Sequence, residues 1–257
     1  MKKYLGFPFA IFLLSIGSAS HTLAQTKDLK TEEKKLVAIC AQMFPENDST
    51  QFYSEEFEKR LSNIVKKNPS SISYPFNQLI QNNDCYIKTS SDGNFRIYSW
   101  DSHTGGTMVF YRVIYQWKSN GKVLTDIPPA EEGDPKSFCS QIFTVDIKGK
   151  SYYLVVTNGN YSTMDAKQSI VVYSIEGNKL SNTAKLFKTK TKSFNKIDVS
   201  YDFFSVKDRS ERPLELIKYD DKQKTVYIPV VGEKGNVTDK NLLYQLKGDY
   251  FEYIGVK

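Results

Sequence analysis

The stretch TMVFYRVIYQWKSNGKVLTDI (residues 107–127) indicates the fold class of this chain. Its apolar and polar residues follow a period of two, which is typical of a β-strand whose successive side chains point to opposite faces of a sheet. Asn120-Gly121 then supplies a type I′ hairpin turn, and Pro128-Pro129 ends the returning strand. One face of the first strand carries Val109, Tyr111, Val113, Tyr115 and Trp117, and the other carries Met108, Phe110, Arg112, Ile114 and Gln116. Because both faces hold apolar side chains, we expect both to be partly buried.

The same strand–turn–strand pattern recurs to the C-terminus. Four further hairpins are expected, with turns at residues 148–149, 176–178, 220–221 and 247–249. No helical crossovers separate these strands, which excludes a parallel α/β sheet. About a dozen short strands of this kind predict a mainly antiparallel β-rich body, built as a sandwich, a barrel or a propeller-like array of consecutive hairpins.

The first third of the chain has the period of helices instead. In residues 31–44 the apolar side chains fall at helical spacing behind Thr31, a favourable N-cap. A second amphipathic helix is expected in residues 54–68 behind Ser54, and a shorter one within residues 74–83. The predicted fold class is therefore α+β, with a short N-terminal helical segment followed by the β-rich body.

The N-terminal residues predict a secretory signal peptide over residues 1–24. Lys2 and Lys3 form its positive end, and they precede an apolar run too short for a comfortable membrane span. An uncleaved anchor is the alternative interpretation. We expect an exported protein, periplasmic or secreted, with no membrane span once the leader is removed. Its helical segment would then cover residues 25–83 and its β-rich domain residues 84–257.

The charge of the chain is only mildly basic. Removal of the predicted leader lowers the formal net charge from +6 to +4, and the lysines are scattered, so nucleic acid is not an expected partner. The densest basic run is KLFKTKTKSFNK, residues 185–196. Its Lys-x-Lys spacing is typical of an edge strand on which charge discourages unwanted pairing, and anion binding is the alternative.

Cys40, Cys85 and Cys139 make an odd number of cysteines for an oxidising compartment. We expect one disulfide between two of the three, with the pair left open, and one buried thiol. Their wide spacing and the scarcity of histidine predict no metal site. The chain contains no phosphate-binding or dinucleotide-binding motif, and no cofactor is expected.

One short stretch, SSDGNFRIYSWD (residues 90–101), resembles a WD40-type β-propeller repeat. It has the Ser-x-Asp-Gly turn and the apolar-Arg-apolar-aromatic strand of such a repeat, although its Trp-Asp pair stands two residues late. The resemblance implies a propeller-like arrangement of the strands. The whole chain also resembles exported bacterial proteins of unassigned function that have a helical start and a β-rich remainder.

The predicted binding site lies in the hairpin around SWDSHTGGTM, residues 99–108. The candidate binding residues are Tyr98, Trp100, Asp101, His103, Gly105 and Gly106. An aromatic platform with a few polar groups suits a carbohydrate or protein ligand. The alternative is that Trp100 fills the core. His103 is the only histidine outside the leader, and its neighbours on the chain are poorly placed to form a catalytic triad with it, so no catalytic residue is predicted.

These observations favour a non-catalytic binding protein of the cell envelope or periplasm. Its partner would be a protein, as for an inhibitor or immunity protein, or an envelope glycan. The first alternative is a carboxylate-dependent hydrolase acting on an envelope polysaccharide, because such an enzyme needs only two Asp or Glu residues brought together by the fold. Carboxylates available for this role are Glu131, Glu132 and Asp134 in one predicted loop and Asp220 and Asp221 in another. The second alternative is a structural envelope component, and the oligomeric state is left open.

Overall fold

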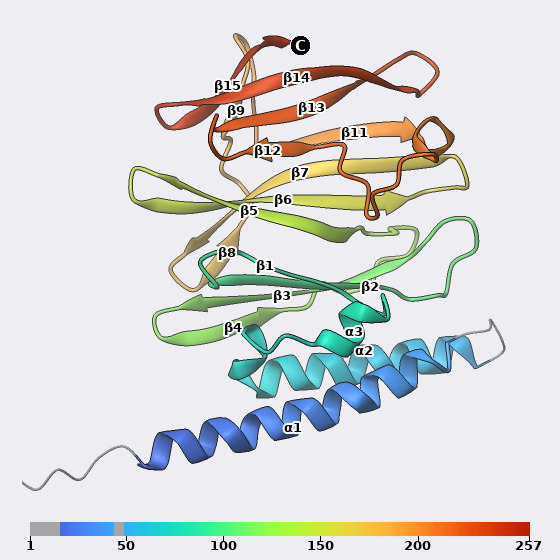
Figure 1. Ribbon diagram of the computed structural model, residues 1–257, viewed down its shortest axis with the longest axis vertical. Helices are drawn as coiled ribbons and strands as arrows, with labels where there is room; N and C mark the ends of the chain where they lie inside the picture. The colour runs from blue at the N-terminus through green and yellow to red at the C-terminus, as the bar shows by residue number, and fades with distance from the viewer. Residues whose placement is uncertain (1–15, 44–48) are drawn as a thin grey trace, which may run out of the picture.

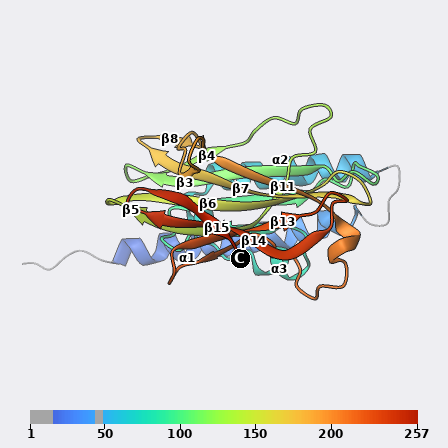
Figure 2. The ribbon, with the colours of Figure 1, turned by 90° about the horizontal axis from the view of Figure 1, so that it is seen from above.

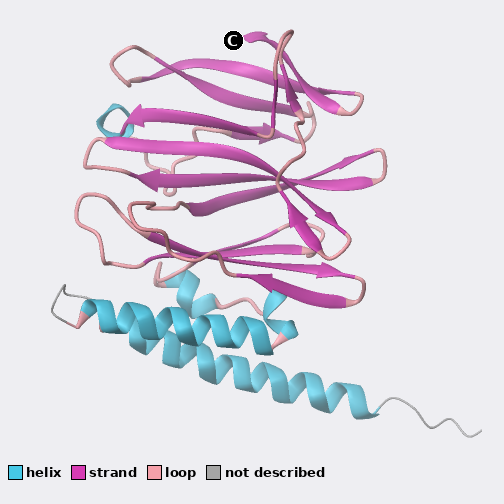
Figure 3. Ribbon diagram, turned by 180° about the vertical axis from the view of Figure 1, so that it is seen from behind, coloured by secondary structure: helices cyan, strands magenta, loops and turns pink. Residues whose placement is uncertain are grey.

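The computed structural model describes residues 16–43 and 49–257, with side chains from residue 28 onwards. Its elements form four stacked layers, a helical layer followed by three mainly antiparallel sheets that we call A, B and C (Figure 1). Seen down the stack, the sheets overlap one another (Figure 2). The helices α1 to α3 lie together at one end of the stack (Figure 3). The predicted α+β class with a mainly antiparallel body is therefore confirmed, and none of the three described sheets closes into a barrel.

The helical layer contains α1 (Ile16–Cys40), α2 (Thr50–Lys67), the 3-10 helix η1 (Pro69–Ile72) and α3 (Asn77–Gln81). The predicted starts of the first two helices are wrong. Thr31 lies inside α1, because residues 18–30 contain no glycine or proline that would end a helix. The second helix begins four residues before Ser54, with Ser49 at its N-cap position. Residues 1–15 of the predicted leader lie outside the described residues.

Sheet A contains β1 (Tyr86–Thr89), β2 (Phe95–Asp101), β3 (Tyr111–Ser119) and β4 (Lys122–Asp126), in that order. The predicted turn at Asn120-Gly121 is confirmed, since both residues have the positive φ that a type I′ turn requires. The predicted strand before it is shorter than expected. Met108, Val109 and Phe110 lie in the preceding loop, because β3 begins at Tyr111.

Sheets B and C contain the remaining strands. Sheet B has the order β11-β7-β6-β5, with β5 (Phe138–Ile147), β6 (Lys150–Asn160), β7 (Asp165–Glu176) and β11 (Lys196–Asp202), and β8 (Lys179–Ser181) pairs with β7. Sheet C has the order β10-β9-β15-β14-β13-β12, with β9 (Phe187–Lys188), β10 (Ser193–Phe194), β12 (Lys218–Asp220), β13 (Thr225–Val231), β14 (Val237–Lys247) and β15 (Tyr250–Val256). The 3-10 helix η2 (Phe203–Val206) follows β11. All four further hairpins are confirmed as antiparallel pairs.

Sheet A is buried on both faces, as the apolar character of both sides of β3 predicts. Tyr98, Trp100 and Ile114 pack against the helices in one core. Phe95 and Trp117 point the other way and join a second core with sheet B. A third core lies between sheets B and C. Because sheet A is an inner layer, each of its strands places different chemistry on two different surfaces.

Candidate functional site

Two of the predicted binding residues, Tyr98 and Trp100, lie in the helix-side core. Their side chains are 0% and 1% exposed. The Trp100 ring meets Phe57 of α2 edge-on, with ring centroids 5.4 Å apart, and Tyr98 meets Phe76 in the same way at 5.8 Å. The alternative that Trp100 fills the core is confirmed. Neither ring can serve as a surface platform for a ligand in this structure, because helices cover both.

The other predicted binding residues form the turn after β2. The His103 backbone N–H donates to Asp101 Oδ1 at 2.7 Å, and His103 Nδ1 lies 3.5 Å from the other carboxylate oxygen. A Cβ on Gly105 would lie 2.0 Å from the Met108 carbonyl oxygen, so this position requires glycine. Gly106 faces open space. Turn geometry accounts for these residues, and their role in recognition stays a prediction.

The predicted disulfide is wrong for this structure, because all three cysteines are free thiols. Cys40 and Cys85 lie in the helix-side core, whereas Cys139 lies in the core between sheets A and B. Cys139 is therefore separated from the other two by sheet A. Burial raises the pKa of each thiol, and that of Cys139 is raised to about 12, so the thiols stay protonated and unreactive.

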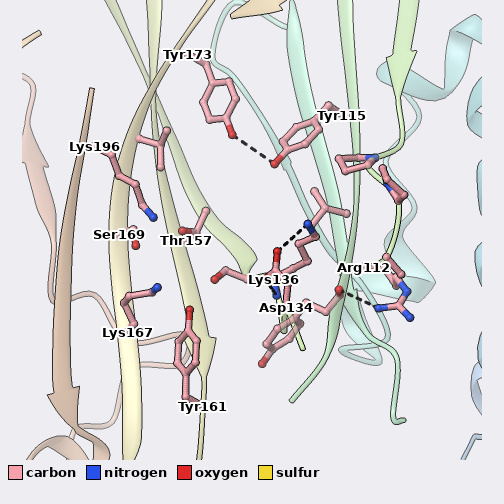
Figure 4. Close-up of a pocket in the computed structure, with 17 residues that line it drawn as sticks. Arg112, Tyr115, Asp134, Lys136, Thr157, Tyr161, Lys167, Ser169, Tyr173 and Lys196 are labelled. Carbon is pink, nitrogen blue, oxygen red and sulfur yellow. Dashed lines mark hydrogen bonds and ion pairs between the residues drawn. The ribbon is translucent and has the colours of Figure 1, made fainter. Parts of the chain in front are cut away.

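A cavity of about 280 Å³ lies between sheets A and B, and we call it the lysine cavity. Figure 4 shows lysine side chains reaching into it from sheet B and from the loop that joins β4 to β5. Its lining consists of Tyr111, Arg112, Val113, Tyr115, Pro128, Pro129, Ala130, Asp134, Lys136, Ser137, Thr157, Tyr161, Lys167, Ser169, Val171, Tyr173 and Lys196. The cavity is near the lower end of the size range of small-molecule sites, roughly 300–1,000 Å³.

Two of the three lysines are ion-paired. Lys136 Nζ lies 2.8 Å from Asp134 and 3.6 Å from Glu131, both in its own loop. Lys196 Nζ lies 2.9 Å from Asp198, its neighbour on β11. These lysines are held in position by their carboxylates, which also neutralise much of their charge.

Lys167 differs from the other two lysines. In the described part of the chain no carboxylate oxygen lies within 4.0 Å of its ammonium group, which instead sits 4.7 Å from the centre of the Tyr161 ring. Burial would lower the pKa of Lys167, but the Tyr161 hydroxyl and the more distant Asp198 and Asp134 outweigh it and hold the pKa above its ordinary value. Lys167 is therefore a protonated cation whose hydrogen-bond donors are available to the cavity.

Arg112 lines the cavity only with its stem. Its guanidinium ion-pairs with Glu58 of α2 at 3.1 Å, on the helix side of sheet A. The rest of the lining is rich in hydroxyl groups: those of Tyr115 and Tyr173 lie 3.4 Å apart at one end, and Thr157 and Ser169 line the wall from sheet B (Figure 4). Among the described residues, the cavity thus combines a lysine that has no carboxylate within 4.0 Å with several hydroxyls and aromatic rings.

The lining is poorly equipped for acid–base catalysis. Asp134 is the only carboxylate among the lining residues. The ammonium of Lys136 holds the pKa of Asp134 below its ordinary value, whereas a general acid at neutral pH needs a raised one. No group of three or more metal-ligating side chains is found in residues 28–43 and 49–257. The arrangement can bind and orient a ligand.

Comparison with known proteins adds no assignment. No protein-family model matches the chain, and no curated protein sequence matches it. Of the helices that the structure describes, none is long and apolar enough to cross a bilayer.

Sequence reasoning missed the lysine cavity. Lys196 ends the basic run 185–196, and it does stand on an edge strand, since β11 is at the edge of sheet B. Lys167 and Tyr161 carry no motif of their own. Lys167 stands on β7, whose two faces are both largely buried, and its side chain lines the cavity between sheets A and B. The sequence around it has the same local pattern as that of a solvated lysine.

Proposed function

We propose that this chain is an exported, non-catalytic binding protein of the cell envelope or periplasm that holds an acidic sugar unit of a glycan in the lysine cavity. Lys167 carries this proposal, since it is a protonated side chain without a carboxylate partner among the described residues. A carboxylate or a sulfate ester on the sugar would supply the missing partner through a charge-assisted hydrogen bond.

The rest of the lining supports a sugar over a simple anion. The hydroxyls of Tyr115 and Thr157 can donate to or accept from sugar hydroxyls. The Ser169 hydroxyl donates to Asp198, so it can only accept a further hydrogen bond. The ring of Tyr161 and the prolines of the β4–β5 loop give the cavity apolar walls for the C–H faces of a sugar ring. An inorganic anion could use the lysines and hydroxyls but would leave the apolar walls without a contact.

Binding is favoured over the carboxylate-hydrolase alternative because Asp134 is the single carboxylate among the described residues that line the cavity. Glu131 is bound to the same lysine and its side chain is 65% exposed.

We also propose that the stack is propeller-like, with sheets A, B and C as successive blades. The WD40-like stretch in residues 90–101 supports this arrangement. Ligand binding between neighbouring blades would then be the common feature of the lysine cavity and its surroundings.

The test is isothermal titration calorimetry of the purified chain with two acidic probes, tetragalacturonate and a chondroitin sulfate tetrasaccharide. We expect saturable binding of at least one, weakened about tenfold or more by Lys167→Gln, which is a loss of at least ~1.4 kcal/mol. The matched control is Lys179→Gln, an exposed lysine of β8 in the same sheet, which should leave the affinity within about twofold. Absence of binding, or equal loss in both variants, contradicts the proposal.

A further inference from the structure

A second hollow of about 450 Å³, which we call the tyrosine cleft, opens beside the lysine cavity. Tyr111 at the start of β3 lines both. The lining comprises Asn83, Tyr86, Tyr111, Phe138, Asn158, Asn160, Tyr201, Phe203, Arg212, Pro213 and Leu214. These residues come from the turn between α3 and β1, from sheets A and B and from the segment after β11, so the fold assembles the cleft from distant parts of the chain.

Stacked aromatic rings form one wall of the cleft. Tyr86 stacks on Phe138 with ring centroids 4.0 Å apart and planes inclined by 21°. Phe138 also contacts Tyr111 at 5.2 Å. Packing on both sides fixes the Phe138 ring, while Tyr86 and Phe203 remain partly exposed. The wall is therefore rigid and offers apolar surface to a ligand.

Three tyrosine hydroxyls in the cleft have no hydrogen-bond partner among the described residues. Those of Tyr86, Tyr111 and Tyr201 make no hydrogen bond to any described residue, whereas the hydroxyls of Tyr98 and Tyr153 are bonded at 2.9 Å. Burial, and after it the fields of Tyr86, Asp101 and Tyr201, raise the pKa of Tyr111, which places these groups near one another. Burial likewise raises the pKa of Tyr201 to about 12. All three stay neutral, so each can donate and accept.

Amide and guanidinium groups complete the rim. The carboxamides of Asn83 and Asn160 make no hydrogen bond within the described residues. Asn158, by contrast, is held by Ser140 and Gln168 and serves as a fixed wall.

Arg212 is fixed at the rim by its own loop. Its guanidinium donates to the carbonyls of Lys207, Arg209 and Glu211 at 2.9, 2.7 and 2.7 Å. No carboxylate of the described residues comes within 4.0 Å of it. Its orientation is therefore set by backbone contacts, which leaves further N–H donors for a ligand.

We propose that the tyrosine cleft binds an uncharged pyranose ring of an oligosaccharide. Such a ring has C–H faces that stack on aromatic side chains and a periphery of hydroxyls, which matches the wall of Tyr86 and the unpartnered hydroxyls and carboxamides of the rim. This site does not depend on the lysine cavity, since the two share only Tyr111. Where both are occupied, one glycan chain spans them.

The test is titration calorimetry with three neutral probes: cellotetraose, mannotetraose and tetra-N-acetylchitotetraose. We expect saturable binding of at least one, weakened about threefold to tenfold by Tyr201→Phe and further by the double variant with Tyr86→Phe. These variants should fold normally, because the lost hydroxyls make no hydrogen bond in the part of the chain that the structure describes. The matched control is Tyr227→Phe, whose hydroxyl bonds to Gln223 in sheet C.

Binding of no neutral probe overturns this proposal, and so does binding that the double variant leaves unchanged. Lys167→Gln separates the two sites. It should weaken the binding of the acidic probes and leave that of the neutral probes unchanged. Tyr201→Phe should weaken the binding of neutral probes in the cleft and leave that of acidic probes in the lysine cavity unchanged. Failure of the acidic probes with retained neutral binding would contradict the proposed function and support the cleft.

Discussion

The two faces of sheet A differ in what covers them. On the helix side, Arg96 donates to the carbonyls of Ser71 and Tyr74, and Gln116 donates to Val65 and Ser71. On the sheet B side, the apolar core gives way near the start of β3 to the lysine cavity and the tyrosine cleft. There Lys167 has no carboxylate within 4.0 Å among the described residues, and the hydroxyls of Tyr111 and Tyr201 bond to no described residue. The helices therefore cover one face of sheet A, whereas the other face is partly open.

The largest expected effect is on the helix side. Trp100→Ala removes a fully buried indole and should lower the free energy of unfolding by about 3–5 kcal/mol. Urea unfolding followed by circular dichroism measures this loss. Phe52→Ala, at a ring that is 63% exposed on α2, is the control and should change stability by less than about 0.5 kcal/mol. Similarly small losses of stability in both variants would mean that the helix-side core contributes little to the stability of the fold.

A smaller effect is expected from Tyr98→Phe. The variant keeps the ring but leaves Gln116 Oε1 and the Ser71 carbonyl, each 2.9 Å from the lost hydroxyl, with one partner fewer inside the core. We expect a loss of about 2 kcal/mol, because an unsatisfied buried acceptor costs its full desolvation. The same urea titration measures it. An unchanged midpoint would show that the helix-side network is not closed.

The pH dependence of stability tests the contact between sheets A and B. Asp92 accepts hydrogen bonds from Ser90, from the Asn94 N–H and from Tyr153 of sheet B. Burial would raise the pKa of Asp92, but these bonds outweigh it and hold the pKa below its ordinary value of 3.8. The carboxylate therefore stabilises the fold above that value, and the contribution is lost as the pH falls through the folded pKa.

Asp92→Asn should accordingly cost about 1 kcal/mol at pH 7, and the difference from the unmodified chain should shrink in acid. Urea midpoints between pH 7 and pH 2.5 measure it. Tyr153→Phe removes one of the donors to Asp92. In that background, the stability difference caused by Asp92→Asn should change less between pH 7 and pH 2.5. A difference that grows in acid would mean that folding raises the pKa of Asp92 instead of lowering it.

The smallest effect on stability is expected at Lys167, on which the proposed function depends. Lys167→Gln removes a charge that has no carboxylate within 4.0 Å among the described residues, so the free energy of unfolding should change by less than about 0.5 kcal/mol. Thermal unfolding without ligand measures it. A large loss would mean that Lys167 stabilises the sheet interface, and its role in the proposed function would need another explanation.

The local parts of the fold could be predicted from the sequence. Alternation and turn residues, glycine in four turns and Asp220-Asp221 in the other, were sufficient for the five hairpins, because neighbouring residues decide each hairpin. The burial of both faces of β3 followed from its apolar content. The stacking of three sheets could not be predicted, since it depends on contacts between residues far apart in the chain. The helix starts failed because a favourable N-cap at Thr31 does not end a helix that is already formed.

The candidate site shows the same limit more sharply. Trp100 and His103 are rare residue types in this chain, but a rare residue type is as common in a core or a turn as in a binding site. The lysine cavity is formed by Lys136, Lys167 and Lys196, which stand on a loop and on two different strands. Only the tertiary fold makes them neighbours, and nothing in the local pattern distinguishes them from solvated lysines.

The pairing of β9 with β15 has a consequence for the order in which the chain assembles. These strands run parallel, with Phe187 opposite Phe251, and the Phe251 N–H donates to the Leu186 carbonyl at 2.7 Å. During synthesis, residues 186–194 emerge some sixty residues before β15, so β9 and β10 stay without their partner strand until the C-terminus is complete. We expect the amides of this segment to gain protection last in pulse-labelled hydrogen exchange, and a chain ending before Tyr250 to leave the Phe187 edge open to aggregation.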